Sequence, residues 1–559
     1  MWVYGDHERA VTRAALLEEV RAAAAVLDSA EPGLTWHSAC VALFLSLSEL
    51  LQGIADEALR ETGVDAPSPA QDAVTAASIA AATAIDRSWR SAFEDQQVPD
   101  LATLSALDEN GALTLRRCEG YAFYAVYPEL YLEAARALPP GALVIGLRSI
   151  GGGLAALAAA ASKAKAVLTV RPGGAFFDRR IAAGPALESR IAESGDAPVA
   201  IVDEGPGLSG SSFGGTADWL EEQGVAPDRI LFMPSHAGDL GPQAREDHRT
   251  RWNARPRLVA AFDDVLLAGP MPLARWFEDL TGPATEPLDD LSGGAWRTRS
   301  PWHDAPADPG RESRKYLLQT DQGRFLLKFV GLDALSTAKF GRARRLFEAG
   351  FAPEPLALRH GFLLERWVHG RQVTPPVSCL AAYLSFRASH FPAETSGAPL
   401  RQLVDMARHN LREGLGEEAT GLLDPWTDDR VEALQPAVQP VHVDARLHRW
   451  EWLETPQGVL KTDAVDHAQA HDLIGCQDIA WDIAGAAIEF DLAPEEIIRL
   501  AEAVMSSRPV ALIDLLLACY LAFQLGWWTF AGEAGVSQRD VYARKIGQRL
   551  RDASSSRNA

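Results

Sequence analysis

The chain has 559 residues, enough for several domains at the usual ~100–200 residues each. Its formal net charge of −22 argues against general nucleic-acid binding and against attachment to an anionic membrane. Its five cysteines are scattered and form no CxxC pair, which argues against a disulfide framework or a cysteine zinc site. A cytoplasmic protein with small-molecule substrates, and without nucleic-acid or membrane partners, is therefore expected.

Residues 1–115 are expected to form a helical N-terminal region. Alanine-rich apolar faces recur along residues 10–27 and 40–62, and the Pro- and Gly-containing segment 63–70 interrupts them. No grouping of catalytic side chains stands out here. The helices are therefore interpreted as a cap on the next unit or as an oligomerisation element that would make a homo-oligomer.

Residues 116–285 show the strand–helix alternation of an α/β unit. Four apolar runs predict the strands of a parallel sheet, at residues 142–147, 166–170, 199–202 and 229–233. The first run leads into Arg148-Ser-Ile-Gly-Gly-Gly-Leu154, where glycines allow the backbone to approach a ligand closely. The glycines alone are weak evidence, since any doubly wound fold can need such a turn.

The most informative segment follows the third of these strands. Asp203 and Glu204 stand at its carboxyl end, and a Gly/Ser-rich turn then leads to a helix-like stretch at 217–223. Amides and the positive end of a helix dipole suit a phosphate, and the paired acids suit the vicinal hydroxyls of a ribose. The alternative is an ordinary Rossmann-like turn in which Asp203 caps a helix.

This segment resembles the PRPP signature of type I phosphoribosyltransferases, in which a hydrophobic strand and two acids precede Thr-Gly-x-Thr. The resemblance implies ribose contacts from Asp203 and Glu204, with Mg²⁺ between the pyrophosphate and the ribose hydroxyls. Serines replace the threonines here, and the spacer 205–208 is longer than in the family. The resemblance also implies two phosphate-binding loops, one for the 5′-phosphate (Ser209, Gly210, Ser211 and Ser212) and one for the pyrophosphate (Arg148, Gly151, Gly152 and Gly153).

A linker is expected at 282–310, and a second pattern follows it. Residues 314–329 predict a hairpin that turns at 321–323, with Lys328 inside an otherwise apolar strand. A helix is expected at 336–350, and then a strand that enters a glycine hinge at 365–370. The chain then carries His442-Val-Asp444, Asp463 and Asp482 in that order.

That order resembles the small-molecule kinase branch of the protein-kinase-like fold, as in aminoglycoside and choline phosphotransferases. The resemblance implies ATP as a substrate: Lys328 would contact its phosphates, Asp444 would act as the base, and Asp463 would bind Mg²⁺. Two departures stand out, since Arg449 occupies the place of the family's metal-binding Asn and the 336–350 helix lacks a clear acid. The extra groups Asp466, His467, His471 and Asp472 crowd the site, as metal ligands or as a solvated loop.

Residues 511–531 are the most apolar stretch of the chain. Asp514, Gln524 and Gly526 interrupt it, so a buried helix is expected rather than a membrane span.

The chain is therefore expected to be an α/β protein with three parts. A helical region (1–115) precedes a phosphoribosyltransferase-like parallel sheet with helices (116–285), and a two-lobed kinase-like α+β domain (289–559) follows. The first functional hypothesis is a bifunctional small-molecule enzyme that uses PRPP, or another ribosyl phosphate, together with ATP. Two alternatives stay open: a non-catalytic PRPP- or ATP-sensing protein with a pseudokinase domain, and an assembly protein that keeps both folds as scaffold.

Overall fold

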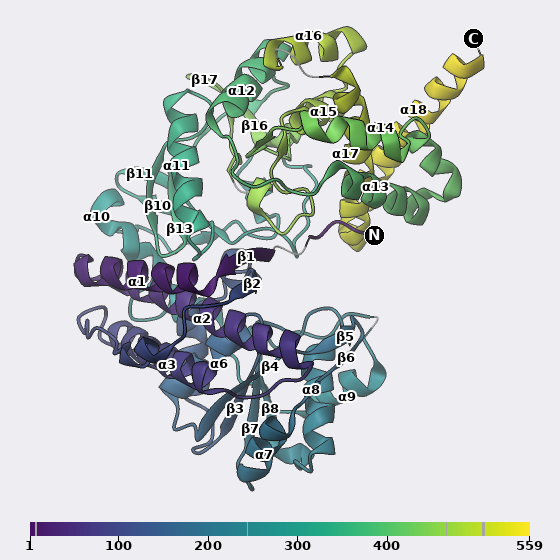
Figure 1. Cartoon of the computed structure of the whole chain (residues 1–559). Coiled ribbons are helices and arrows are strands. Elements are labelled where there is room, and N and C mark those ends of the chain that lie inside the picture. The colour runs from purple at the N-terminus through teal and green to yellow at the C-terminus, as the bar shows by residue number, and fades with distance from the viewer. Residues whose placement is uncertain (6–7, 243, 466, 506–508, 559) are drawn as a thin grey trace.

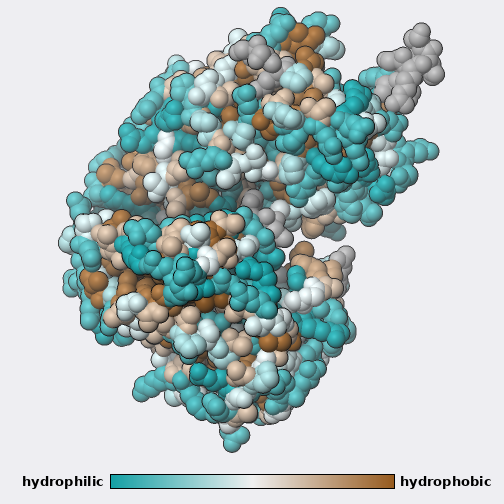
Figure 2. All heavy atoms as spheres, in the orientation of Figure 1, coloured by the Kyte–Doolittle hydropathy of each residue, from teal (hydrophilic) through white to brown (hydrophobic). Residues whose placement is uncertain are grey.

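The computed structural model describes residues 1–5, 8–242, 244–465, 467–505 and 509–558. Figure 1 shows the helical N-terminal region and the parallel sheet in one half of the molecule, with a helical lobe in the other. The antiparallel sheet joins these halves. The visible surface is predominantly hydrophilic, with scattered apolar side chains, as a highly charged chain leads one to expect (Figure 2).

Three long helices form the N-terminal region: α1 (Arg13–Ser29), α2 (Leu34–Thr62) and α3 (Pro69–Arg90). The hydroxyls of Thr12 and Ser68 cap α1 and α3 by accepting backbone N–H groups of the first turn. Both α2 and α3 pack against α6 (Gly151–Ala161), so the region caps one face of the parallel sheet. Strand β1 (Glu8–Thr12) pairs with β2 (Ala112–Arg116) and closes the region.

All four predicted strands are present and form one parallel sheet in the order β4-β3-β7-β8. Their side chains alternate between two cores: Val199 and Ile201 of β7 join one, while Ala200 and Val202 join the other. The strands are β3 (Leu143–Leu147), β4 (Ala166–Val170), β7 (Val199–Val202) and β8 (Ile230–Met233). Around them lie α4 (Glu119–Ala122), α5 (Pro128–Ala135), β5 (Gly173–Ala175), β6 (Asp178–Arg180), α7 (Pro185–Glu193), α8 (Ser211–Glu222), α9 (Glu246–Ala254) and α10 (Glu278–Thr281).

The predicted hairpin is the centre of an antiparallel sheet with the order β12-β13-β11-β10-β9. It turns through residues 321–322 into Gly323, whose φ of 133° favours glycine. The predicted helix follows as α11 (Leu335–Glu348). The strands are β9 (Asp289–Asp290), β10 (Lys315–Thr320), β11 (Gly323–Phe329), β12 (Pro355–Arg359) and β13 (Phe362–Arg366).

A helical lobe completes the two-lobed arrangement expected of the C-terminal part. Helix α17 packs against α13, α15 and α18. Both α17 and α2 are long and apolar enough to cross a membrane, but most of each is buried inside the fold, as predicted for α17. The lobe contains α12 (Val377–His390), α13 (Leu400–Leu415), α14 (Asp428–Leu434), α15 (Ala480–Glu489), α16 (Pro494–Val504), α17 (Val510–Phe530) and α18 (Val536–Asn558), with the short strands β14 (Arg371–Gln372), β15 (Pro440–Val441), β16 (Trp452–Thr455), β17 (Gly458–Lys461) and β18 (Gln477–Asp478).

One hydrophobic core crosses the predicted boundary between the second and third parts. It joins Leu43 and Phe44 of α2 to Tyr127 and to Phe329 and Phe362 of the antiparallel sheet. The first and second parts are also packed on each other through α2, α3 and α6. The antiparallel sheet therefore uses the N-terminal helices as part of its own core.

The first residues of the chain pack into the helical lobe, which the sequence did not predict (Figure 1). Val3 is fully buried in the core of that lobe. The Trp2 N–H donates to Oδ1 of Asn410 at 2.6 Å, and the Leu473 N–H donates to the Val3 carbonyl at 2.9 Å. The N-terminal segment is therefore held by residues of the helical lobe that lie about 400 or more positions later in the sequence.

Candidate active site

A cavity of about 940 Å³ lies between the antiparallel sheet and the helical lobe, within the ~300–1,000 Å³ typical of small-molecule sites. Its walls come from β11, from the predicted hinge 365–370, and from the loops 446–453 and 462–472. Residues 290–315 also line it, although most of them were predicted to be a linker. Arg311 holds this segment in place by packing over the rings of Tyr4, Trp527 and Phe530.

Lys328 and Asp463 are in direct contact on the wall of this cavity. The Lys328 Nζ donates to Oδ1 of Asp463 at 2.7 Å, and both residues line the cavity. Burial alone would raise the pKa of Asp463, but Lys328 and the neighbouring cations hold it well below its usual range. The structure thus brings together the predicted phosphate-contacting lysine and the predicted metal-binding acid, with Asp463 ionised.

Glu451 supplies a second carboxylate that the sequence analysis missed. One ligand atom each from Glu451, Asp463 and His467 lies within 4.8 Å of the others, a spacing that suits a metal ion. Burial raises the pKa of Glu451 to about 7, although Lys461 opposes the shift with an Nζ–Oε2 contact of 2.6 Å. Burial also lowers the pKa of His467 well below its usual range, so its imidazole is neutral.

Arg449, at the position of the family's metal-binding Asn, lies away from the cavity. The Arg449 guanidinium donates to the Glu489 carbonyl and to Asp491, both at 2.6 Å. It therefore points to the outside of the helical lobe and offers nothing to a metal. Glu451, two residues further along the same loop, instead lies beside Asp463 and His467.

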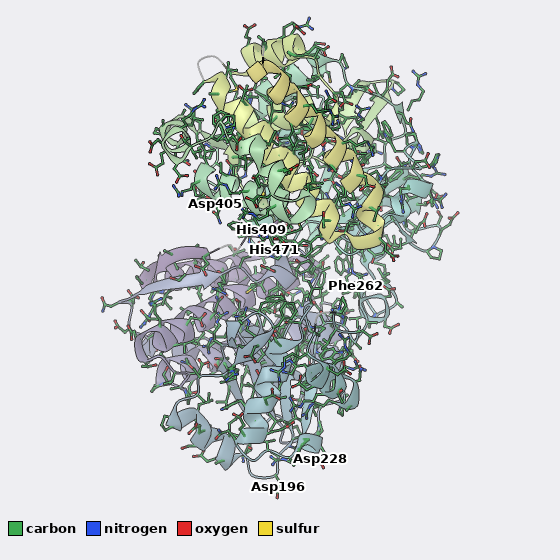
Figure 3. All side chains as sticks on the ribbon, turned by 90° about the vertical axis from the view of Figure 1, so that its right-hand side faces the viewer. Asp196, Asp228, Phe262, Asp405, His409 and His471 are labelled. Carbon is green, nitrogen blue, oxygen red and sulfur yellow. The ribbon has the colours of Figure 1, made fainter. Side chains whose placement is uncertain are left out.

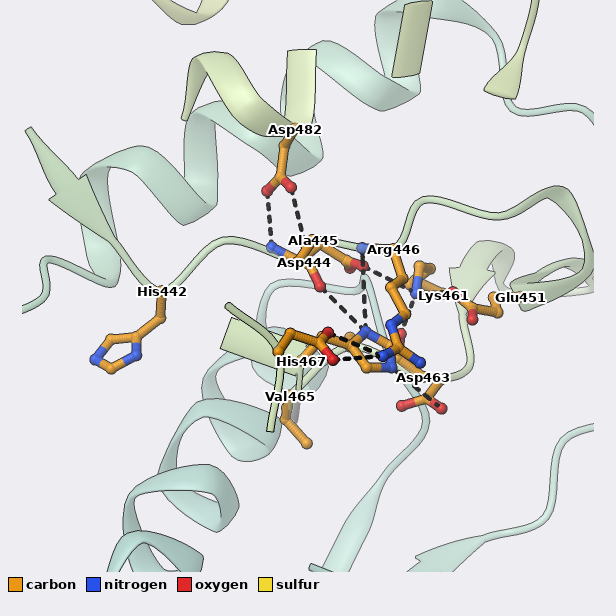
Figure 4. A network of polar contacts seen from close by, with 12 residues as sticks. His442, Asp444, Ala445, Arg446, Glu451, Lys461, Asp463, Val465, His467 and Asp482 are labelled. Atoms are coloured by element: carbon orange, nitrogen blue, oxygen red, sulfur yellow. Dashed lines mark hydrogen bonds and ion pairs between the residues drawn. The ribbon is translucent and has the colours of Figure 1, made fainter. Parts of the chain in front are cut away.

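Asp444 does not face the cavity, contrary to the expectation for a base. It is 1% exposed, accepts a short hydrogen bond from the Tyr383 hydroxyl, and lies 3.3 Å from the Lys461 Nζ. Its backbone N–H and that of Ala445 donate to the two carboxylate oxygens of Asp482 at 2.7 and 2.8 Å (Figure 4). Asp482 thus holds the loop through two backbone N–H groups, and the Asp444 carboxylate lies beside the fully buried Lys461.

The other side chains singled out in the sequence of this region do not share one site. His442 points away from the network in Figure 4, and its Nδ1 lies 3.3 Å from Sγ of Cys476. Asp472 lines the cavity and accepts two hydrogen bonds from Arg446, at 2.9 and 3.1 Å. His471 also lines the cavity. Asp466 lies outside the described residues.

Asp203 and Glu204 line a second, polar cavity of about 200 Å³ at the carboxyl ends of β3 and β7. The Gly120 N–H donates to Oε2 of Glu204 at 2.7 Å. Burial and the charge of Glu204 raise the pKa of Asp203 well above its usual range, and burial and Glu119 raise that of Glu204 to about 7. The acids therefore share a recess at the sheet edge, as predicted, but a recess smaller than a typical ligand site.

The predicted pyrophosphate loop is held by other parts of the protein. Arg148 lines the recess, but its side chain is 1% exposed and its guanidinium donates to Asp56, Asp65 and Thr169, so its charge is already paired within the protein. The three glycines serve close packing. A Cβ at Gly151 would lie 2.7 Å from the Val202 carbonyl, one at Gly152 would crowd Leu51, and one at Gly153 would overlap Ser48.

The predicted phosphate loop lies outside the lining of this recess. The Ser209 and Ser211 hydroxyls are 2.9 Å apart, and the Ser211 hydroxyl donates to the Phe176 carbonyl at 2.6 Å. Gly210 has a φ of 60° and precedes α8, whose first residues are Ser211 and Ser212. The helix N-terminus is therefore present, but the Ser209 and Ser211 hydroxyls already form hydrogen bonds with each other and with the Phe176 carbonyl.

An ion pair joins residues that line the two cavities. Glu119 lines the recess, His471 lines the larger cavity, and their Oε1 and Nε2 atoms are 2.9 Å apart. Tyr124 contacts Nδ1 of His471 at 2.7 Å, and Phe123 stacks on the same ring. Figure 3 places His471 where the two halves of the molecule meet.

No family model matches the chain, and no curated protein matches it significantly. Among solved structures it is similar to choline kinase LicA from Streptococcus pneumoniae (15% identity, 42% of this chain and 89% of that one, TM-score 0.31). A choline/ethanolamine kinase family protein from Mesorhizobium loti (16%, 51% and 91%, 0.33) and a macrolide 2′-phosphotransferase type I (14%, 48% and 91%, 0.31) are similar too. These TM-scores are too low to decide function, which has to come from the site itself.

Proposed function

We propose that the cavity between the antiparallel sheet and the helical lobe binds Mg·ATP and transfers its γ-phosphoryl group to a hydroxyl of a small molecule. The observation that carries this proposal is the Lys328–Asp463 pair, at 2.7 Å, on the wall of a cavity of about 940 Å³. Phosphoryl transfer needs positioning and charge stabilisation more than covalent chemistry. A lysine and two carboxylates in a shielded cavity supply both.

Lys328 would steady the phosphates of the nucleotide. Asp463 and Glu451 would hold the metal, since hard divalent cations prefer carboxylate oxygens, and the neutral His467 lies beside them. The metal would neutralise charge on the β- and γ-phosphates. Segment 365–370, which begins at the end of β13 and lines the cavity, would contact the adenine.

Asp444 takes a positioning role in this proposal. Its carboxylate, with those of Glu451 and Asp463, surrounds Lys461, and these three raise the pKa of that lysine against the effect of burial. Lys461 in turn donates to Oε2 of Glu451 and to the backbone carbonyl of Asp463. Asp444 therefore acts on the metal-binding acids through Lys461.

Binding of Mg·ATP, measured by calorimetry on the full chain, tests the proposal. Lys328→Met and Asp463→Asn should each weaken binding at least tenfold, while Asp405→Asn, on the outside of α13, should leave it unchanged (Figure 3). ATP consumption with a panel of hydroxyl compounds then tests for transfer. Equal affinity in the wild type and in both cavity variants would overturn the nucleotide site, and binding without turnover would leave a nucleotide-sensing pseudokinase.

A second candidate function belongs to the recess at the carboxyl end of β7. The paired acids at the end of β7 suit the vicinal hydroxyls of a ribosyl phosphate such as PRPP. A bound Mg²⁺ would favour their ionised forms over the protonated forms that burial favours. The recess of about 200 Å³ would have to enlarge to admit the whole ligand. In transfer from PRPP, a nucleophile would bond to C1′ as pyrophosphate leaves with the bonding electron pair, and the acids would stabilise the positive charge on the ribose.

Thermal shift with PRPP and Mg²⁺ tests this second function. A shift that is lost in Asp203→Asn and kept in Asp196→Asn would support it, since Asp196 is exposed at the far end of the unit (Figure 3). Release of pyrophosphate with candidate nucleophiles would then establish transfer. Identical melting of the wild type with and without PRPP would refute it.

A further inference from the structure

Three residues that are far apart in the sequence meet in a buried cluster outside both cavities. His37 comes from α2, Glu129 from α5, and His360 from the turn between β12 and β13. His37 and Glu129 are 0% exposed and His360 is 5% exposed. The cluster thus lies where the N-terminal helices, the α/β unit and the antiparallel sheet pack together.

The three side chains converge on one point. Nε2 of His37 is 2.7 Å from Oε1 of Glu129, and Nε2 of His360 is 3.0 Å from the same oxygen. The second oxygen, Oε2, is buried and has no hydrogen-bond partner among the described residues. A buried carboxylate oxygen without a partner is costly, and such groups normally pair with a charge or bind a metal.

The far sides of both imidazoles are held as metal ligands usually are. Nδ1 of His37 lies 3.1 Å from the Ser88 hydroxyl, and Nδ1 of His360 lies 3.2 Å from the Ser38 hydroxyl. When Nδ1–H donates to such an oxygen, Nε2 is left as a lone-pair donor toward the centre of the cluster. The Tyr127 hydroxyl fixes the turn by donating to the His360 carbonyl at 2.7 Å.

We propose that His37, His360 and Glu129 form a structural site for a divalent transition metal, with Zn²⁺ as the best fit. Two imidazole nitrogens and the Glu129 carboxylate are donors that zinc binds in proteins, and the unpartnered Oε2 can complete a chelate with Oε1. Zinc bonds of about 2.0–2.1 Å place tetrahedral donors about 3.3 Å apart. The nitrogens would therefore retreat from Oε1 by only about 0.3–0.6 Å. In the metal-bound site each neutral imidazole carries its proton on Nδ1, toward Ser88 or Ser38, and the site joins three parts of the fold.

Metal content tests the proposal directly. The full chain, purified without a histidine tag, should carry about one zinc per chain by plasma mass spectrometry. Chelation should lower Tm by at least about 2 °C, and one equivalent of Zn²⁺ should restore it. Glu129→Gln keeps the shape and most hydrogen bonds of the cluster and should lose the zinc.

Matched controls separate this cluster from two others that contain His and carboxylates. His467→Gln disrupts the group around Asp463, and His248→Gln disrupts the group around Asp218. Both variants should keep the zinc of the buried site. If Glu129→Gln or His360→Ala fails to fold, the wild-type metal content and the chelator response still decide. Zinc-free wild type with the same Tm in chelator and in Zn²⁺ would overturn the proposal and leave a hydrogen-bonded cluster.

Discussion

Replacing Glu204 by glutamine should stabilise the protein by an amount that grows with pH. Burial, and then the charge of Glu119, raise the pKa of Glu204 from 4.5 to about 7, against the opposing effects of the Gly120 N–H and His471. Between these two values the folded chain keeps a proton that the unfolded chain has lost. The free energy of unfolding therefore falls as the pH rises through this window, and the loss is complete above pH 7.

The difference between 4.5 and 7, at about 1.36 kcal/mol for each pH unit, gives about 3 kcal/mol. Glutamine removes this cost and keeps an oxygen for the Gly120 N–H. It also removes the repulsion between the two carboxylates, because the charge of Glu204 raises the pKa of Asp203. At about 2.1 cal/mol/K per residue, the unfolding entropy of 559 residues is about 1.2 kcal/mol/K, so Tm should rise by about 3 °C.

Thermal melts of the wild type and Glu204→Gln at pH 5, 6, 7 and 8 measure this effect. The gain should stay under about 1 °C at pH 5 and reach about 3 °C at pH 8. Glu193→Gln, at an exposed carboxylate of α7, should show no such trend. A gain for Glu204→Gln that is constant across this range, or that shrinks toward pH 8, would refute the reasoning.

Four further substitutions test other parts of the structure. Val3→Ala should lower the free energy of unfolding by about 2 kcal/mol in denaturant melts, because it empties part of the helical-lobe core. Gly341→Ala, in the interior of α11 with nothing within 4 Å of a new Cβ, should raise it by about 0.5–1 kcal/mol, whereas Gly146→Ala would overlap the Gly151 carbonyl and should lower soluble yield sharply. His471→Ala should raise the pKa of Glu204 further, so the Tm gain of Glu204→Gln in this background should keep growing above pH 7.

Local patterns were sufficient to predict most of the elements. Apolar runs of four or five residues mark β3, β4, β7 and β8 because both faces of the parallel sheet are covered. The two-residue turn before Gly323 identifies the hairpin that carries Lys328. The order of motifs along the chain was enough to single out Lys328 and Asp463, and the structure places the two side chains in contact.

The role of a side chain was hard to predict where its partner is distant in the sequence. Arg148 and the glycines that follow it have the composition of an anion site. Asp56 and Asp65 of the helical region, however, pair with the arginine and neutralise its charge. Glu451 has no motif of its own, and only the folded structure brings it beside Asp463 and His467. His37, Glu129 and His360 belong to three separate segments, so no spacing rule could have brought them together.

The two candidate sites are linked by a physical contact as well as by sharing one chain. Helix α4 presents Glu119 to the recess, and the next residues, Phe123 and Tyr124, line the larger cavity. A ligand that brings charge to either cavity changes the energy of the Glu119–His471 pair. The change reaches Glu204, because Glu119 and His471 shift its pKa in opposite directions. Binding at one site should therefore alter affinity at the other, and by linkage the effect must be reciprocal.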